Sequence, residues 1–243
     1  MTKTQGAERN ESLYIRVYFV LEALLYVAIQ YAQEFLAVRP MKNIMYASIV
    51  VNTVMALWLY AKYGRREVKR WDNLLALGLA VNCVADAFLT LIGGEAMQIP
   101  GYISFCTVEA VYAVYLKPDR KNLTARVIVL LALWLFAWGI HLFTFANAAG
   151  LLNISLLSVN VFAAWAARRR NPDRPSLLFA LALTSFLVGD ISVGAELFLT
   201  PGTLPYVLVE HAVWIFYVPA QVLILLTYYA RIRRPALESG KAS

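Results

Sequence analysis

The sequence predicts an all-α fold: a polytopic transmembrane bundle of about eight helices, forming a single domain over residues 1–243. Hydrophobic residues make up 60% of the chain and charged residues 15%, whereas soluble domains carry about a quarter charged residues. Apolar runs of about 20 residues, the length that crosses a bilayer, recur along the chain. These runs are too long for the strands of a membrane β-barrel. Together, these observations predict membrane-spanning helices.

Each apolar run defines one expected span. The spans cover residues 13–36, 41–61, 73–93, 97–116, 124–146, 149–167, 176–199 and 205–230. The connections between them are short, which favours antiparallel neighbours packed in one bundle. The polar N-terminal segment lacks the features of a signal peptide, so the first span is expected to act as an uncleaved insertion signal.

Polar residues recur at helical spacing in most of the spans. In chain order, these stripes are Glu22, Tyr26, Gln30 and Gln33; Ser48 and Asn52; Asn82, Asp86 and Thr90; Glu109 and Tyr112; Trp134, Trp138 and His141; Asn153 and Asn160; and Glu210, Trp214, Tyr217, Gln221 and Tyr228. Hydrogen bonding between helices can explain any single stripe. Their presence on so many spans favours a wet cavity inside the bundle.

Lys and Arg residues cluster in alternate connections and after the last span, which predicts that these loops and both termini are cytoplasmic. This distribution accounts for the net charge of +7 without a nucleic-acid partner. Arg39 and Lys42 are exceptions, because this topology puts them on the outer side. They could snorkel to the interface or bind a phosphate headgroup. We expect a multi-pass integral protein of a plasma membrane, of the bacterial inner-membrane type.

Carboxylic acids within apolar helices are rare and commonly functional. Asp86, Glu109 and Asp190 lie inside three different spans, and their depths would let them converge in the outer half of the bundle. Val-Glu follows a small residue and Asp in both halves of the chain, at Glu109 and at Glu210. This pattern would fit a parallel repeat of spans one to four and five to eight. Chance similarity between apolar helices explains it equally well.

The residue inventory excludes several kinds of chemistry. Two histidines, His141 and His211, are too few for a histidine-rich diiron site or for a zinc hydrolase. No Lys lies mid-helix to form a retinal Schiff base. Nucleophile-elbow, P-loop and dinucleotide-binding motifs are also missing. Cys83 and Cys106 lie in apolar helices and are expected to be reduced packing residues. We therefore expect neither a metal nor a cofactor.

Paired carboxyl groups can perform acid–base catalysis without a metal. Removal from water favours the neutral form, so one buried acid can hold a proton while its partner is ionised. The protonated acid then delivers a proton and the carboxylate activates water. The same residues could form a proton relay in a small transporter, or could be purely structural. The residues alone leave these three alternatives open.

Five short segments resemble the lysoplasmalogenase (YhhN-like) family of integral membrane hydrolases, in that family's order. They are Arg39–Met41, Asn82–Leu89, Ile103–Tyr115, Phe186–Asp190 and Tyr217–Ile224. The second and fourth segments resemble its small-residue-plus-Asp elements, and the last resembles its Tyr-x-x-Ala-Gln-x-Leu-Ile helix. The sequence departs from this pattern at Ala85, where the family has Gly. It also departs at Glu109, where the family has His.

This resemblance implies hydrolysis of the vinyl ether bond of a lysoplasmalogen, which yields a fatty aldehyde and a glycerophospho-base. The expected catalytic residues are Asp86, Asp190 and Glu109. The expected substrate-binding residues are Asn82, Tyr112, Glu210, His211, Tyr217, Gln221, Arg39 and Lys42. A lysophospholipid and the surrounding membrane lipids are the expected partners. The alternative is a lipid-binding protein or small proton-linked transporter with the same fold. The sequence does not define the oligomeric state.

Overall fold

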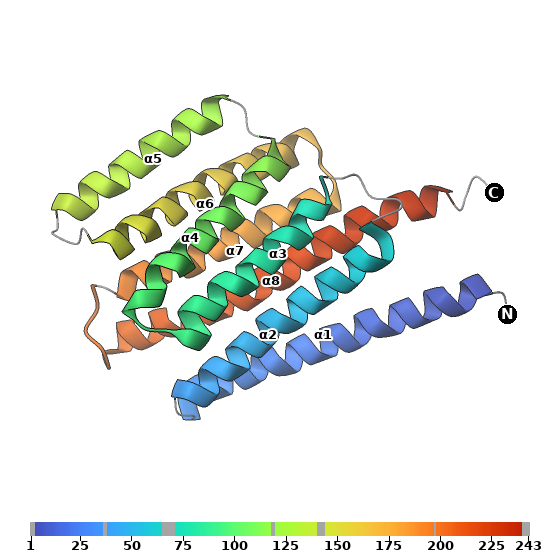
Figure 1. The fold of residues 1–243 in the computed structure, drawn as a ribbon, viewed down its shortest axis with the longest axis horizontal. Coiled ribbons are helices and arrows are strands. Elements are labelled where there is room, and N and C mark those ends of the chain that lie inside the picture. The colour runs from blue at the N-terminus through green and yellow to red at the C-terminus, as the bar shows by residue number, and fades with distance from the viewer. Residues whose placement is uncertain are drawn as a thin grey trace.

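A computed structural model of the chain describes residues 3–35, 38–64, 71–117, 120–139, 144–196 and 198–239. Within these ranges the protein consists of helices, as predicted (Figure 1). The α-helices are α1 (Lys3–Phe35), α2 (Val38–Leu59), α3 (Asn73–Asp86), α4 (Glu95–Leu116), α5 (Arg120–Gly139), α6 (Phe145–Arg170), α7 (Arg174–Glu196) and α8 (Leu204–Ser239). Two π-helical turns, η1 (Tyr60–Gly64) and η2 (Ala87–Ile92), continue α2 and α3.

Seven helices in the described ranges are long and apolar enough to cross a membrane. This finding confirms the all-α, multi-span fold and is consistent with a multi-pass integral membrane protein. The apolar part of α5, Val127–Gly139, is shorter. The span predicted at 124–146 includes residues 140–143, and with them His141, which lie outside the described residues. The internal repeat and the cytoplasmic side stay predictions.

The helices pack mainly with their neighbours in the chain, as expected from the short connections. The contact between α7 and α8 is the most extensive, and α8 also packs against α1, α2 and α3. Leu79, Leu183 and Ile224 are fully buried where α3, α7 and α8 meet. The helix α4 packs on both α3 and α6, whereas α5 lies at the edge of the bundle against α6 (Figure 1). The site described below lies among α3 to α8.

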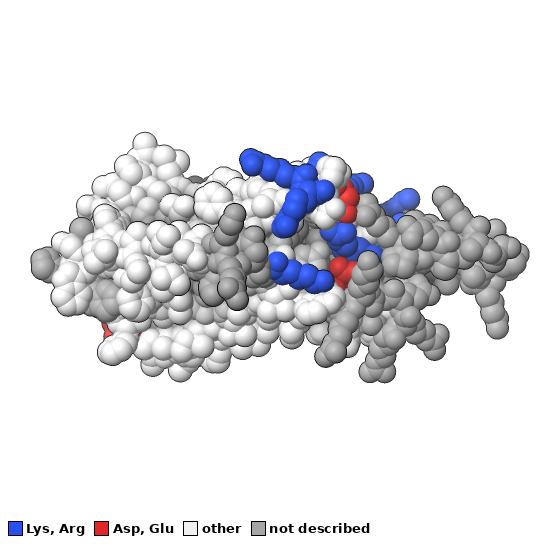
Figure 2. All heavy atoms as spheres, turned by 90° about the horizontal axis from the view of Figure 1, so that it is seen from above, with Lys and Arg blue, Asp and Glu red and all other residues white. Residues whose placement is uncertain are grey.

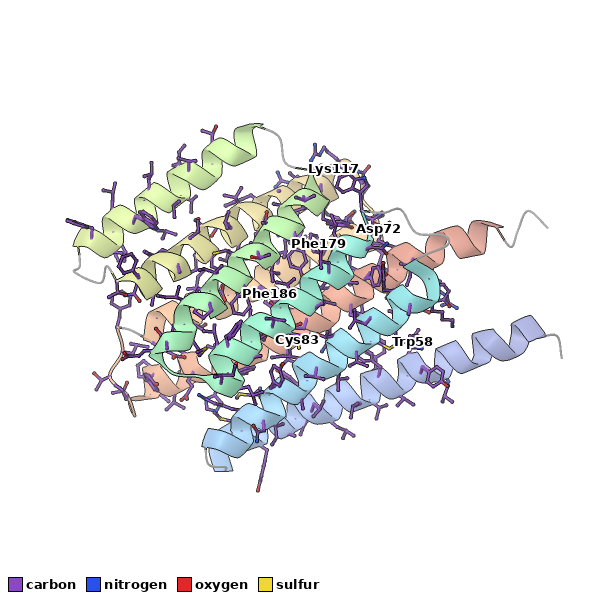
Figure 3. The ribbon with its side chains drawn as sticks, in the orientation of Figure 1. Trp58, Asp72, Cys83, Lys117, Phe179 and Phe186 are labelled. Atoms are coloured by element: carbon purple, nitrogen blue, oxygen red, sulfur yellow. The ribbon has the colours of Figure 1, made fainter. Side chains whose placement is uncertain are left out.

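Side chains on the outer surface are largely apolar, as Figure 3 shows for the helices at the edge of the bundle. Figure 2 shows Lys and Arg gathered toward one end of the visible face. Some of these cations contact aromatic rings: Lys62 lies over Trp58, and Lys117 lies over Trp71. Amphipathic aromatic and basic residues are typical anchors at a membrane interface. We refer to this region as the basic end of the bundle.

The turn between α3 and α4 is built by a π-helical turn and two glycines. The turn η2 begins immediately after Asp86, and Gly93 and Gly94 follow it with positive φ angles of 66° and 86°. Such angles favour glycine, since it has no Cβ. π-helical turns occur frequently at functional sites. Here, η2 and the first turns of α4 form part of a cavity wall that begins at Asp86.

Candidate active site

A cavity of about 860 Å³ lies among α3 to α8, and Lys42 of α2 also lines it. Its walls come from the end of α3 and η2, the first turns of α4 and α6, the end of α7, the first half of α8, and part of α5. Most of the lining side chains are apolar, with a few polar groups among them. A large apolar cavity with few, convergent polar groups is typical of a small-molecule site.

Asp86 lies on one wall of this cavity and is only 4% exposed. The hydroxyl of Tyr217 on α8 donates a hydrogen bond of 2.5 Å to its Oδ2. The amide of Asn82 donates to the same oxygen over 2.8 Å, and to the Tyr217 hydroxyl over 2.8 Å. Asn82 reaches Asp86 because residues four apart lie on one face of a helix. Two donors from two helices therefore fix the position of this carboxyl group.

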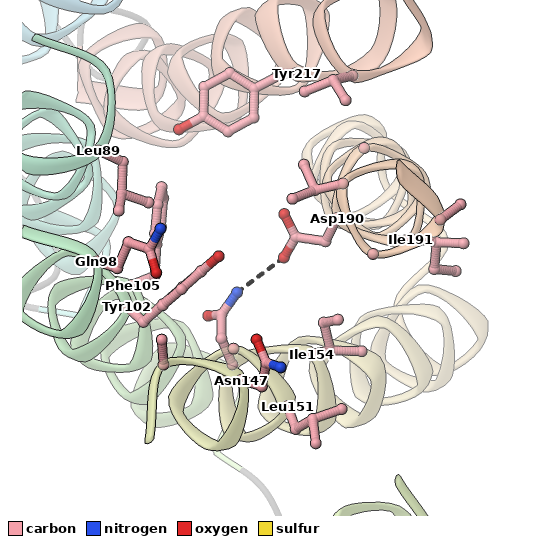
Figure 4. A pocket seen from close by; sticks show the side chains of 18 of the residues that line it. Leu89, Gln98, Tyr102, Phe105, Asn147, Leu151, Ile154, Asp190, Ile191 and Tyr217 are labelled. Atoms are coloured by element: carbon pink, nitrogen blue, oxygen red, sulfur yellow. Dashed lines mark hydrogen bonds between the residues drawn. The ribbon is translucent and has the colours of Figure 1, made fainter. Parts of the chain in front are cut away.

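Asp190 projects into the same cavity from α7 (Figure 4). The amide of Asn153 on α6 donates to its Oδ2 over 2.8 Å. The other polar atom of that amide, Oδ1, is buried and has no hydrogen-bond partner among the described residues. Asp86 and Asp190 both line this cavity. The cavity therefore brings together two acids that lie far apart in the sequence.

Several of the other predicted site residues also reach this region. Tyr217 and Lys42 line the cavity, and Asn82 donates a hydrogen bond to Asp86. Asn153 lines the cavity, and the sequence analysis had placed it on a polar stripe without naming it among the expected site residues. Its signal was an amide inside an apolar span, on the polar stripe of α6. That stripe could not show which of its two Asn residues would meet an acid in the cavity.

Glu109 does not line the cavity. It lies between α4 and α6, is 5% exposed, and accepts a 2.7 Å hydrogen bond from the amide of Asn160 at Oε2. The same amide donates to the backbone carbonyl of Glu109 over 2.8 Å. Glu109 is thus held in a closed contact between two helices. The structure does not bring this predicted catalytic residue to Asp86 and Asp190.

Tyr112 and Gln221 lie in the bundle core rather than on the cavity wall. The ring of Tyr112 packs edge-on against Phe179 and fills the space above Gly78. Gln221 is 1% exposed, and neither polar atom of its side chain has a partner among the described residues. Both residues were predicted to bind substrate. Neither residue lines this cavity, so their assignment to substrate binding stays a prediction.

Three further predicted substrate-binding residues lie away from the cavity wall or outside the described part. Glu210 and His211 are half-buried on α8 and do not line the cavity. The Nδ1 atom of His211 is 2.7 Å from the carbonyl oxygen of Val207, one turn earlier. The side chain of Arg39 lies outside the residues whose side chains the structure describes. Lys42 is therefore the predicted headgroup cation that can be placed at the cavity.

Comparison with known families agrees with the order of motifs in the sequence. The profile of the YhhN family matches residues 45–228, which is most of the chain. This range includes Asp86, Asp190 and Tyr217, while Arg39 and Lys42 precede it. Curated proteins and solved structures gave no match. The chain therefore belongs to the YhhN family, which includes lysoplasmalogenases.

Proposed function

We propose that this protein is a membrane-embedded hydrolase that cleaves the vinyl ether bond of lysoplasmalogens. The observation that carries this proposal is the placement of Asp86 and Asp190 on the walls of one largely apolar cavity. Membership of a family that includes lysoplasmalogenases supports the same reaction. The products are a fatty aldehyde and a glycerophospho-base, and the reaction consumes one water molecule.

The proposed reaction needs one proton donor and one proton acceptor. The protonated carboxyl group of the pair gives its proton to the vinyl carbon remote from the ether oxygen, which leaves an oxocarbenium ion. The ionised carboxyl group takes a proton from water as the water oxygen bonds to the other vinyl carbon. The resulting hemiacetal loses its hydroxyl proton as the bond to the glycerol oxygen breaks and that oxygen is protonated. Aldehyde and alcohol leave, and the pair again holds one proton.

The neighbours of the two acids have positioning roles in this proposal. Tyr217 and Asn82 hold Asp86, and Asn153 holds Asp190. Glu109 is assigned to the packing of α4 on α6, because its hydrogen bonds to Asn160 lie outside the cavity.

A panel of lysolipids tests the reaction directly. Purified protein is given vinyl ether, saturated ether and ester lysolipids that share one chain and one headgroup, and aldehyde release is measured. We expect aldehyde from the vinyl ether alone. Asp190→Asn should lower that rate about 10²–10⁴-fold, the usual contribution of a general acid or base. Asp72→Asn, at the opposite end of α3, is the control and should keep the wild-type rate. Full activity of Asp190→Asn would contradict the assignment.

Lys42 is proposed to bind the phosphate of the substrate, because its side chain reaches the cavity from the start of α2. A Lys ammonium group binds phosphate as a point charge. Lys42→Gln should raise KM several-fold for a lysophospholipid, by about 1 kcal/mol of lost binding. It should leave KM unchanged for a neutral vinyl ether that has the same chain and lacks phosphate. An equal effect on both substrates would remove Lys42 from headgroup recognition.

A second candidate function is lipid binding without hydrolysis, or proton-linked transport, with the two acids as a proton relay. The observation that favours it is the largely apolar lining, which suits a lipid whether or not a reaction follows. Native mass spectrometry separates the two functions. An intact lysoplasmalogen retained by the protein, with no aldehyde formed over the same period, would favour the binding function.

A further inference from the structure

The cavity continues past Asp190 into an apolar region between α5, α6 and α7. Leu133 and Phe136 of α5, Leu151 and Ile154 of α6, and Ile191 and Gly194 of α7 line this region, which we call the apolar arm. Figure 4 shows Leu151 and Ile154 on α6 and Ile191 on α7. An aliphatic chain attached to a group held between the two acids would find apolar walls here.

The apolar arm reaches the outer surface of the bundle. Phe136 is 59% exposed and Ile191 is 56% exposed, although both line the cavity. The main neighbour of α5 is α6, so α5 forms one side of this region from the edge of the bundle. These exposed side chains are apolar, as expected for a surface inside a bilayer. A lipid chain can therefore enter from the bilayer without crossing water.

Gly194 is the position where α7 leaves space for such a chain. It follows Asp190 by one turn on the same face of the helix and lines the cavity. A Cβ atom added there would meet no described atom within 4 Å. Gly194 lies in the last turn of α7, which ends at Glu196.

Two other helical glycines are closely packed. A Cβ at Gly78 would lie 2.2 Å from the ring of Tyr112, and one at Gly101 would lie 2.5 Å from Leu89. At both positions a neighbouring side chain occupies the space that the glycine leaves. At Gly194, which lines the cavity, no described atom occupies that space.

We propose that Gly194 is a specificity-determining residue that keeps the apolar arm open for the aliphatic chain of a single-chain lipid. The absence of a side chain at this position leaves room for the chain one turn beyond Asp190. This inference rests on the proposed function for the identity of the substrate. It adds the location of the chain and a residue that leaves room for it.

The test replaces Gly194 by Leu and measures kcat/KM for vinyl ether lysolipids with chains from ethyl, which ends before Gly194, to octadecyl. We expect the ratio of long-chain to short-chain kcat/KM to fall at least about tenfold relative to wild type. Gly139→Leu is the matched control. Gly139 also lies in a helix, a Cβ there also meets no described atom, and it does not line the cavity. Its chain-length profile should equal that of wild type.

An unchanged profile in Gly194→Leu, or an equal loss at every chain length, would overturn the inference. Gly194→Ala is a milder variant that suits α-helix propensity, and it should shift the profile in the same direction by a smaller factor.

A binding measurement separates this inference from the hydrolysis itself. Native mass spectrometry with saturated ether lysolipids of the same chain series should show selective loss of the longest chains in Gly194→Leu. If wild type retains these lipids but releases no aldehyde, the proposed hydrolysis fails and the chain site stands. If Gly194→Leu retains the longest chains as wild type does, the chain site fails.

Discussion

Asp86 and Glu109 are two acids that are similar in burial but differ in their surroundings. Both lie within apolar helices, both are almost fully buried, and both accept a short hydrogen bond from an Asn amide. Asp86 also accepts from Tyr217, and it borders the cavity that contains Asp190. Glu109 is closed off by Asn160, which also binds its backbone carbonyl. One acid faces space for a ligand, and the other fastens two helices together.

The difference shows that burial of an acid in a membrane helix does not by itself indicate chemistry. An acid in the bilayer needs hydrogen-bonding partners, whether its role is structural or catalytic. Both acids have them here. What separates them is the access of a substrate and the presence of a second carboxyl group, and only Asp86 has both.

The largest expected effect comes from neutralising the two acids in parallel. Asp86→Asn should lower kcat/KM for vinyl ether cleavage by about 10³-fold, because it removes one of the two proton-transfer groups. Glu109→Gln keeps an acceptor for Asn160 and should stay within about twofold of wild type, the range expected where no transition-state contact is lost. Aldehyde release by the purified variants is the measurement. A comparable loss of kcat/KM in both variants would contradict the different roles of the two acids and would indicate that Glu109 is also catalytic.

A smaller effect is expected from the group that positions Asp86. Tyr217→Phe removes one hydrogen bond to the carboxyl group and leaves that of Asn82, so kcat should fall about tenfold, near the value of one hydrogen bond to a charged group. Tyr228→Phe is the control, since its hydroxyl binds Asn73 at the other end of α3. The steady-state rates of both variants decide the matter. If Tyr228→Phe loses as much activity as Tyr217→Phe, the loss does not come from the hydrogen bond between Tyr217 and Asp86.

The smallest effect concerns stability. Asn160→Ala breaks the contact between α4 and α6 and should lower the free energy of unfolding by about 1 kcal/mol, typical of polar contacts between membrane helices. The specific activity of the folded protein should not change. Asn153→Ala is the counterpart on the same helix, and it should lower activity because it releases Asp190. Denaturant titration measures the stability of each variant, and the aldehyde assay measures its activity. A loss of activity in Asn160→Ala without one in Asn153→Ala would contradict the assignment.

Hydropathy and polar spacing were sufficient to predict the helices and several residues of the site. Asp86 and Asp190 both line the cavity, as their expected convergence requires, whereas Glu109, which was expected with them, does not. Helical periodicity shows which residues share a face, but it does not show which neighbouring helix that face meets. Because α4 packs against α6 as well as α3, the face with Glu109 turns to Asn160. The same limit applies to Gln221 and Tyr112: the spacing shows the face on which each lies, but not that this face meets the core instead of the cavity.

The link between Asp86 and Tyr217 also affects how the protein is made. These two residues are 131 positions apart in the chain. Because the N-terminal part of a chain is synthesised first, α3 is complete long before α7 and α8 exist. Asn82 lies one turn before Asp86 in the same helix, so its hydrogen bond needs no later segment. Asp86 can therefore be hydrogen-bonded to Asn82 as soon as α3 has formed. Its hydrogen bond with Tyr217 forms only after α8 has been synthesised.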